Sequence, residues 1–145
     1  MDTRVNVITL AVDDLERALV FYRDGLGFRS QGIIGTEWSD ERTGANGAIA
    51  LFELDNGLLL SLYPRRDLAL DAEIELSPAQ GGEFSLGQLV RSRGEVDELL
   101  RKAEAAGASV TEANDRPWGI YSGYFRDPDG HLWEVIWNPG RVPPP

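Results

Sequence analysis

The feature that most constrains the fold of this chain is an internal repeat. The stretch "LAVDDLE" in the first half corresponds to "QLVRSRGE" in the second, and "FELDNGLLLSLYP" aligns with "FRDPDGHLWEVIWNP" when Gly57 is set on Gly130. Internal repetition of this kind usually dictates the architecture of a fold. Each half alone would be a small sheet with a helix on one face and an uncovered apolar strip on the other. We therefore expect the halves to pair and to enclose a cup.

Both halves predict the order strand, helix, strand, strand, strand. The first module spans about residues 4–63 and the second about residues 84–138. Residues 64–83 are expected to be a connecting segment, because charged and small residues interrupt the pattern there. The sequence thus predicts an α+β fold, with tandem βαβββ repeats forming a curved mixed sheet in a single domain over residues 1–145.

Local signals place the elements within these modules. Asp13 with Glu16, and Ser92 with Glu95, each have the spacing of a capping box that begins a helix. Alternating apolar residues, bounded by turn residues, predict strands over residues 5–12, 28–38, 47–54, 58–64, 84–90, 108–113, 120–127 and 131–137.

Composition excludes several classes of function. The chain has no cysteine, so disulfides, thiolate ligands and thiol nucleophiles are absent. The net charge of −10 repels phosphate backbones and anionic lipids, so neither nucleic acid nor a membrane is an expected partner. The N-terminus lacks a basic segment followed by a long apolar stretch, and we therefore expect a cytoplasmic protein.

The stretches "VITLAVDDLERALVFYRDGLGF" and "WGIYSGYFRDPDGHLWEVIWNP" resemble the vicinal oxygen chelate superfamily, which includes glyoxalases, bleomycin resistance proteins and extradiol dioxygenases. The resemblance covers nearly the whole chain and implies this superfamily's fold. It does not imply one function, because the scaffold is shared by isomerases, lyases, epimerases, dioxygenases, thiol transferases and binding proteins. It also allows a homodimer, because relatives often complete the cup by pairing chains and exposed sheet edges favour such pairing.

In metal-using relatives, four strand positions supply ligands to one divalent ion, and the resemblance transfers these positions to Val7, Ser61, Ser85 and Glu134. A register slip of one residue would replace Ser61 by Leu60. Only Glu134 has a suitable donor, whereas Mn, Fe, Ni and Zn sites generally need about three or more nitrogen or anionic oxygen donors. We therefore expect no cofactor. The alternative is a divalent metal held by ligands outside this register.

Glu134 is the candidate for chemistry. It is expected either to accept a hydrogen bond or a proton from a bound small molecule, with Ser61 and Ser85 as neighbours, or to pair with an arginine and stabilise the sheet. His131 stands an odd number of residues away, so strand alternation predicts that it points to the opposite face.

Aromatic residues supply the remaining candidates. Alternation puts Tyr121 and Tyr124 on opposite faces, and we expect Tyr121, with Trp118, to line the cup and suit an aromatic or planar ligand. The favoured function is metal-free binding of a small, partly apolar or aromatic molecule. The alternatives are a metal-free enzyme with Glu134 as general base and a metal-dependent enzyme such as a lactoylglutathione lyase-like lyase, an isomerase or a dioxygenase.

Overall fold

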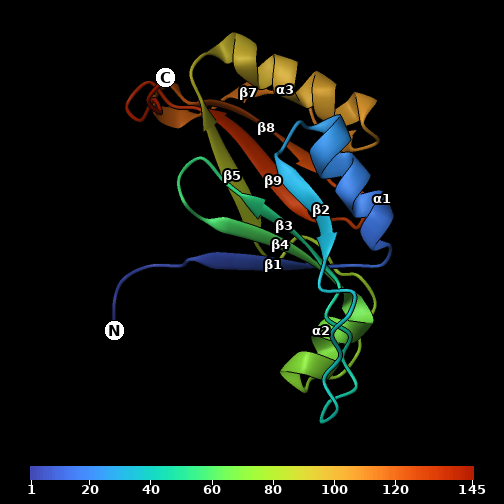
Figure 1. The fold of residues 1–145 in the computed structure, drawn as a ribbon. Helices are drawn as coiled ribbons and strands as arrows, with labels where there is room; N and C mark the ends of the chain where they lie inside the picture. Colours follow the sequence, from blue (N-terminus) through green and yellow to red (C-terminus); the bar gives the residue numbers. More distant parts are fainter. The chain divides into compact units, whose positions relative to one another are not determined.

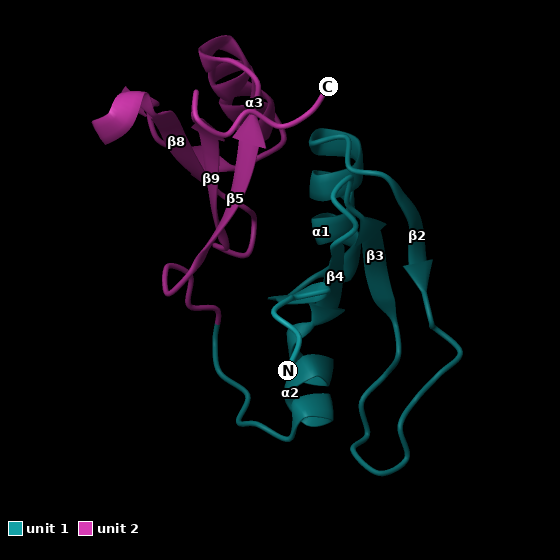
Figure 2. Cartoon of the chain, turned by 90° about the vertical axis from the view of Figure 1, so that its left-hand side faces the viewer, with its two compact units in different colours: residues 1–78 teal, residues 79–145 magenta.

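The computed structural model describes residues 1–145. The chain divides into two compact units, residues 1–78 and residues 79–145, shown in different colours in Figure 2. Each unit contains one sheet and its own buried apolar residues.

The first unit is a four-stranded mixed sheet (Figure 1). Its strands lie in the order β1-β4-β3-β2, with β1 parallel to β4 and the other neighbours antiparallel. The elements are β1 (Val7–Val12), α1 (Leu15–Leu19) continued by the π-helical turn η1 (Val20–Gly25), β2 (Ser30–Ile34), β3 (Ile49–Glu53), β4 (Leu59–Pro64) and α2 (Arg65–Ala72).

The core of the first unit lies between its sheet and the helical segment α1–η1. Tyr22, within η1, packs edge to face on Phe52 of β3, with 6.0 Å between the ring centroids. Phe52 is paired with Leu60 of β4, and all three side chains are fully buried. Because side chains alternate along a strand, Ser61 points to the opposite face from Leu60.

The second unit repeats this arrangement. Its strands lie in the order β5-β9-β8-β6, with β5 parallel to β9, and a short strand, β7, pairs with β8. The elements are β5 (Ser85–Val90), α3 (Arg93–Ala105), β6 (Ser109–Val110), β7 (Asn114–Asp115), the 3₁₀ turn η2 (Pro117–Gly119), β8 (Tyr121–Arg126) and β9 (Leu132–Trp137). The predicted α+β fold and its repeated order of elements are confirmed.

The two sheets also share a strand register. Val7 is paired with Leu59 in the first unit, and Ser85 is paired with Leu132 in the second. Ser61 and Glu134 stand two residues further along the last strand of each sheet. The alignment of Gly57 with Gly130 therefore matches equivalent positions in the two units.

Three local details differ from the expectation. The segment 64–83 was expected to be a connection, but it contains the helix α2. The first helix is capped by Asp14 rather than Asp13, since the Asp14 carboxylate accepts a 3.0 Å hydrogen bond from the amide of Arg17. Asp13 instead forms a 2.8 Å ion pair with Arg65. The strand β7 was not predicted, because two exposed polar residues carry no alternating apolar pattern.

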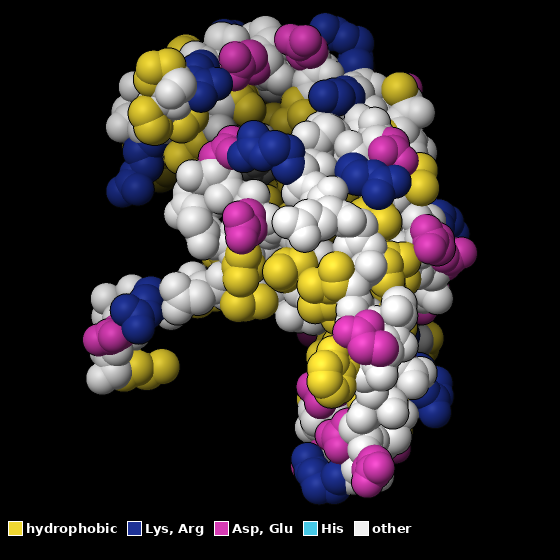
Figure 3. Space-filling view, in the orientation of Figure 1, with side chains coloured by type: hydrophobic (Ala, Val, Ile, Leu, Met, Phe, Trp, Pro, Cys, Tyr) yellow, Lys and Arg dark blue, Asp and Glu magenta, His cyan; other side chains and the backbone are white.

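The surface carries charges of both signs (Figure 3). Figure 3 shows one face of the molecule, on which basic side chains are interspersed with carboxylates and form no continuous basic band. None of the helices is both long and apolar enough to cross a bilayer.

Candidate functional site

The sheet of the second unit has one face packed on α3 and one face free of that helix. Phe125 and Trp133 stack in parallel on the α3 side, with 5.8 Å between ring centroids, and both are buried. Alternation along the three long strands puts the intervening residues on the other side. We call this side the Glu134 face; it carries Ser85, Gly87, Leu89, Ser122, Tyr124, Arg126, Leu132, Glu134 and Ile136.

Glu134 and Tyr124 form a pair at the centre of this face. They are directly opposite each other in the antiparallel register of β8 and β9. Burial raises the pKa of the Tyr124 phenol, and the nearby charge of Glu134 raises that pKa further. Glu134 takes part in no ion pair with an arginine. Its carboxylate thus lies on the strand position opposite a neutral tyrosine and has no cationic partner.

Arg116 brings a positive charge to the same face. Its Nε donates a 3.2 Å hydrogen bond to the hydroxyl of Ser122, and its Nη2 donates a 3.3 Å bond to the Ser122 carbonyl. Ser122 is fully buried and stands two residues before Tyr124 on β8. The charge of Arg116 acts on Tyr124, where it opposes the rise in the phenol pKa.

Gly87 of β5 leaves a gap beside Glu134 of β9. The two residues are paired in the parallel register. A Cβ placed on Gly87 would meet only the Cδ1 of Ile136, at 3.4 Å, and the backbone there is of ordinary strand type. Neither packing nor backbone geometry therefore requires a glycine. A glycine inside a strand often marks a place where a ligand approaches the backbone.

Gly123 on β8 shows the contrasting case. A Cβ on Gly123 would lie 2.7 Å from the Cδ1 of Leu100 in α3 and 3.1 Å from the Cα of Ala113. This glycine is required for the helix to pack on the sheet. Of the two glycines in the strands of this sheet, only Gly87 lacks such a packing reason.

A hollow of about 260 Å³ opens at the outer edge of the sheet. Tyr124 and Leu132 contribute to it from the Glu134 face, and Ser109 and Thr111 contribute from the edge strand and the residues that follow it. The Thr111 hydroxyl accepts a 3.0 Å hydrogen bond from the amide of Tyr124. The phenyl ring of Tyr124 therefore borders open space on its edge side.

Tyr121 lies on the α3 side, and this corrects its expected placement. Its phenol donates a 2.7 Å hydrogen bond to Asp97 of α3, and the guanidinium of Arg93 lies 4.2 Å from its ring centroid. The hydrogen bond with Asp97 and then burial raise the pKa of Tyr121. The two tyrosines do face opposite ways, as alternation predicted, but Tyr124 is the one that shares a face with Glu134.

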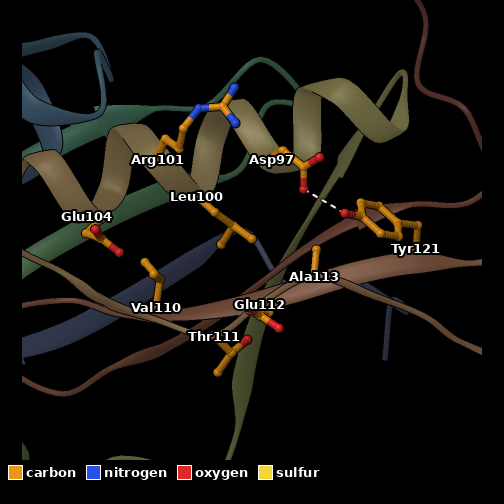
Figure 4. Close-up of a pocket in the computed structure, with 9 residues that line it drawn as sticks. All are labelled: Asp97, Leu100, Arg101, Glu104, Val110, Thr111, Glu112, Ala113 and Tyr121. Atoms are coloured by element: carbon orange, nitrogen blue, oxygen red, sulfur yellow. Dashed lines mark hydrogen bonds between the residues drawn. The ribbon is translucent and has the colours of Figure 1, made fainter.

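Tyr121 borders a separate groove of about 340 Å³ between α3 and residues 110–113. Figure 4 shows its phenol directed at Asp97 at one end of this groove. The residues that line the groove are Asp97, Leu100, Arg101, Glu104, Val110, Thr111, Glu112, Ala113 and Tyr121.

The other predicted residues are distributed over both units. Ser85 is exposed on the Glu134 face. Its partner on β9 is Leu132, two residues before Glu134. Ser61, with only 6% of its surface exposed, belongs to the sheet of the first unit. Trp118 is 90% exposed in η2, with a left-handed φ of 64°. His131 lies in the β8–β9 turn, where its amide donates a 2.9 Å hydrogen bond to Asp127.

The metal ion implied by the family resemblance does not fit the transferred positions. Val7 has no donor atom, and Ser61 and Ser85 offer neutral hydroxyls. Glu134 is the single carboxylate, and its neighbour is the phenol of Tyr124. No three His, Asp or Glu side chains of the chain gather where they could hold an ion. Divalent transition metals generally need more nitrogen or anionic oxygen donors than this set provides.

Sequence reasoning missed Tyr124, Arg116 and Gly87. For Tyr124 a signal was present, because a turn closed by Asp127 and His131 makes residues 124 and 134 cross-strand partners. Gly87 could have been noted as a glycine inside a predicted strand. Arg116 had no signal, since its position depends on the irregular turn that follows it.

Comparisons with known proteins agree with this architecture. The family model described as Glyoxalase/Bleomycin resistance protein/Dioxygenase superfamily matches residues 4–135. A glyoxalase-related enzyme from Fulvimarina pelagi is 30% identical, with a TM-score of 0.76, and the match covers 94% of this chain and 88% of that chain. No curated protein sequence matches the chain.

Two further solved structures resemble the chain. Lactoylglutathione lyase from Agrobacterium tumefaciens is 25% identical, with a TM-score of 0.64 and coverage of 94% of both chains. The fosfomycin resistance protein FosX from Listeria monocytogenes is 21% identical, with a TM-score of 0.67 and coverage of 95% of both chains, and this likeness concerns the fold alone. On the family match and the Fulvimarina relative, the chain belongs to the glyoxalase/bleomycin resistance protein/dioxygenase superfamily.

Proposed function

We propose that this protein binds a small, partly apolar or aromatic molecule on the Glu134 face, and that binding does not require a metal ion. The observation that carries the proposal is the Tyr124–Glu134 pair. The two side chains are cross-strand partners, and Glu134 takes part in no ion pair within the chain, so its carboxylate oxygens are available to a ligand.

The surroundings of the pair support a ligand with an apolar body. Leu132 and Ile136 flank Glu134 on its own strand, and both are partly exposed. The gap at Gly87 lets a flat group approach the strand backbone beside the carboxylate. Ligand sites generally combine an apolar lining with a few placed polar groups, and this face has that composition.

The proposal includes Ser85, which shares the face, and Trp118, whose turn begins at the Arg116 anchor. It leaves out Tyr121, because that side chain is bonded to α3. A contribution from Ser61 and the sheet of the first unit stays a prediction.

A second candidate is a metal-independent enzyme in which Glu134 is the general base. The observation that favours it is that no arginine neutralises this carboxylate, so it can accept a proton from a bound molecule. The superfamily contains both enzymes and resistance proteins, and the names of the similar structures reflect both.

Ligand screening with Glu134 variants tests the proposal. Full-length protein, dialysed against a chelator, would be screened by thermal shift with aromatic acids, phenols and drug-like compounds. We expect hits that raise the melting temperature of the wild type and fail to do so for Glu134→Gln. The control is Glu98→Gln, which removes an exposed carboxylate on α3.

Metal analysis gives the decisive contrast. We expect elemental analysis to find no stoichiometric transition metal, and Mn²⁺, Ni²⁺ or Zn²⁺ to leave the melting temperature and the hits unchanged. A tightly held stoichiometric metal, or hits that disappear on chelation, would contradict the proposal. Incubating each hit with the protein, and analysing it for a product that Glu134→Gln does not form, tests the second candidate.

A further inference from the structure

We infer that the ligand of the Glu134 face is an organic acid: its carboxylate binds Arg116, and a hydroxyl or N–H group at its other end donates to Glu134. This inference rests on the proposed function and specifies its ligand class. The observations that carry it are the anchoring of Arg116, the absence of a carboxylate partner for it, and its spacing from Glu134.

Arg116 is held in place by one part of its guanidinium. Nε and Nη2 donate to the hydroxyl and the carbonyl of Ser122, which is buried in β8. A guanidinium has five N–H donors in a fixed fork, so these two bonds leave donors directed away from Ser122. Those donors have no acceptor in the chain, and the residue is exposed. The protein therefore fixes the orientation of this side chain but leaves some of its N–H donors without an acceptor.

The charge of Arg116 is not compensated, although the protein is strongly acidic. The chain has 24 Asp and Glu residues and a net charge of −10. Asp115, the residue next to Arg116, forms its 2.6 Å ion pair with Arg93 instead. Arg116 itself takes part in no ion pair. A fixed guanidinium without a carboxylate partner is suited to bind one from a ligand, because the planar fork matches carboxylate geometry.

The position of Ser122, which anchors Arg116, relative to Glu134 indicates the approximate size of the ligand. Ser122 is paired with Ile136, and Tyr124 is paired with Glu134, so Ser122 and Glu134 are diagonal neighbours across β8 and β9. Diagonal neighbours in a sheet stand roughly 7–8 Å apart. The side chains on this part of the face are Ile136 and the ring of Tyr124. A molecule with about one ring between its carboxylate and its donor group fits this arrangement.

The pair of charges also selects against other ligand classes. A dianion would bring negative charge to Glu134, and a simple organic cation would bring positive charge to Arg116. A neutral aromatic molecule would leave the guanidinium unpaired. An acid with a separate donor group satisfies both side chains.

Matched aromatic probes test the inference on the full chain. 4-Hydroxybenzoate has both groups, 4-hydroxybenzamide lacks the negative charge, and 4-methoxybenzoate lacks the donor. Dissociation constants would be measured by NMR titration of isotopically labelled protein, following the resonances of Tyr124 and Glu134. We expect 4-hydroxybenzoate to bind at least about tenfold more tightly than either analogue, because each analogue loses a charge-assisted hydrogen bond.

Variants of Arg116 separate charge from packing. Arg116→Gln should weaken 4-hydroxybenzoate about tenfold or more, while binding of 4-hydroxybenzamide changes less than about threefold. The affinity of Arg116→Lys for 4-hydroxybenzoate should lie between those of the wild type and Arg116→Gln, because the charge remains and the planar fork of donors is lost. The control is Arg141→Gln, an exposed arginine near the C-terminus, which should change neither probe.

The possible outcomes distinguish this inference from the proposed function. Equal affinities for 4-hydroxybenzoate and 4-hydroxybenzamide at the Glu134 face, with no effect of Arg116→Gln, would overturn the organic-acid assignment and leave the binding face intact. If no probe perturbs the resonances of the face at millimolar concentration, the proposed function and the inference fail together.

Discussion

Tyr124 and Glu134 face each other across β8 and β9, and the charge of Glu134 adds to the effect of burial in raising the pKa of the Tyr124 phenol. This pairing differs from the two usual fates of an acid in a sheet, an ion pair with arginine or coordination of a metal. Glu134 thus has a neutral residue opposite it and no cation that would cancel its charge. The first prediction concerns this pair.

Tyr124→Phe should weaken ligand binding without unfolding the protein. The variant removes the hydroxyl of the residue opposite Glu134, and one hydrogen bond from that hydroxyl to the carboxylate or the ligand contributes about 0.5–1.5 kcal/mol. We therefore expect the dissociation constant of an aromatic acid to rise about threefold to tenfold, measured by calorimetry. The phenyl ring stays in place, so the melting temperature should change little. Unaltered affinity in a folded variant would show that the phenol does not position the acid.

The protein should lose stability at alkaline pH through its tyrosines. The pKa values of Tyr63 and Tyr124 are raised by burial first, and that of Tyr121 by its hydrogen bond with Asp97 first. Above about pH 10 the unfolded state releases these protons while the folded state retains them, so the folded state binds more protons and the free energy of unfolding decreases as pH rises. Below that pH the contribution is fully present.

Urea unfolding between pH 8 and pH 11, followed by circular dichroism, measures this effect. Tyr121→Phe should show a shallower decrease above pH 10 than the wild type, because one of the shifted groups is absent. A steeper decrease would mean that the shift of Tyr121 has the opposite sign.

Gly87→Val should block the ligand and preserve the fold. Valine favours strands, and the only nearby atom is the flexible Cδ1 of Ile136. The free energy of unfolding should therefore stay within about 1 kcal/mol of the wild type. The added side chain fills the gap beside Glu134, and thermal-shift hits should disappear. A variant that still binds them would place the ligand elsewhere.

Gly123→Ala, in contrast to Gly87→Val, should destabilise the fold. Its Cβ would collide with Leu100 and with the backbone of Ala113, and a side-chain rotation can relieve only the first contact. We expect a loss of about 1–3 kcal/mol, measured by urea unfolding. Gly87→Ala, the matched control, should be close to neutral. Equal losses in the two variants would contradict the distinction between a packing glycine and a site glycine.

Trp118→Gly should lower ligand affinity at little cost in stability. The side chain is 90% exposed, and its φ of 64° is a conformation that glycine adopts more easily than tryptophan. If the indole covers an aromatic ligand, its loss should weaken binding several-fold by calorimetry. Trp38→Ala, which removes an exposed indole from the first unit, serves as the control. Indistinguishable affinities in the two variants would remove Trp118 from the site.

Much of the fold could be predicted because its signals are local. The turns at Gly57 and Gly130 take left-handed φ values of 87° and 88°, and β3 before the first turn and β9 after the second alternate between buried and less buried residues as expected. Ser92 caps its helix through the amide of Glu95, as the capping-box spacing predicted.

The helix α2 could not be predicted, because its signals are not local. It has no side-chain cap, and few apolar residues define a buried stripe. Asp67 ties the helix to a distant loop by accepting a 2.9 Å hydrogen bond from the amide of Asn46. A contact between residues 21 positions apart leaves no pattern in the helix sequence itself.

The candidate site was predicted only in part, for a similar reason. Glu134 and Ser85 follow from the strand alignment, and the structure puts them on one face. Arg116 reaches that face because its amide donates to the carbonyl of Ile120, closing a turn around Trp118. Such irregular backbone is set by tertiary structure, so the arginine that shares this face with Glu134 was not visible in the sequence.

The parallel pairing of β1 with β4, and of β5 with β9, is made by backbone groups alone. Side chains at Val7, Ser61, Ser85 and Glu134 can therefore be exchanged during evolution while the strands stay joined. A lineage could gain or lose ion-binding chemistry at these positions by successive single replacements, each in a protein that still folds. The fold and the ion-binding side chains can therefore evolve independently of each other.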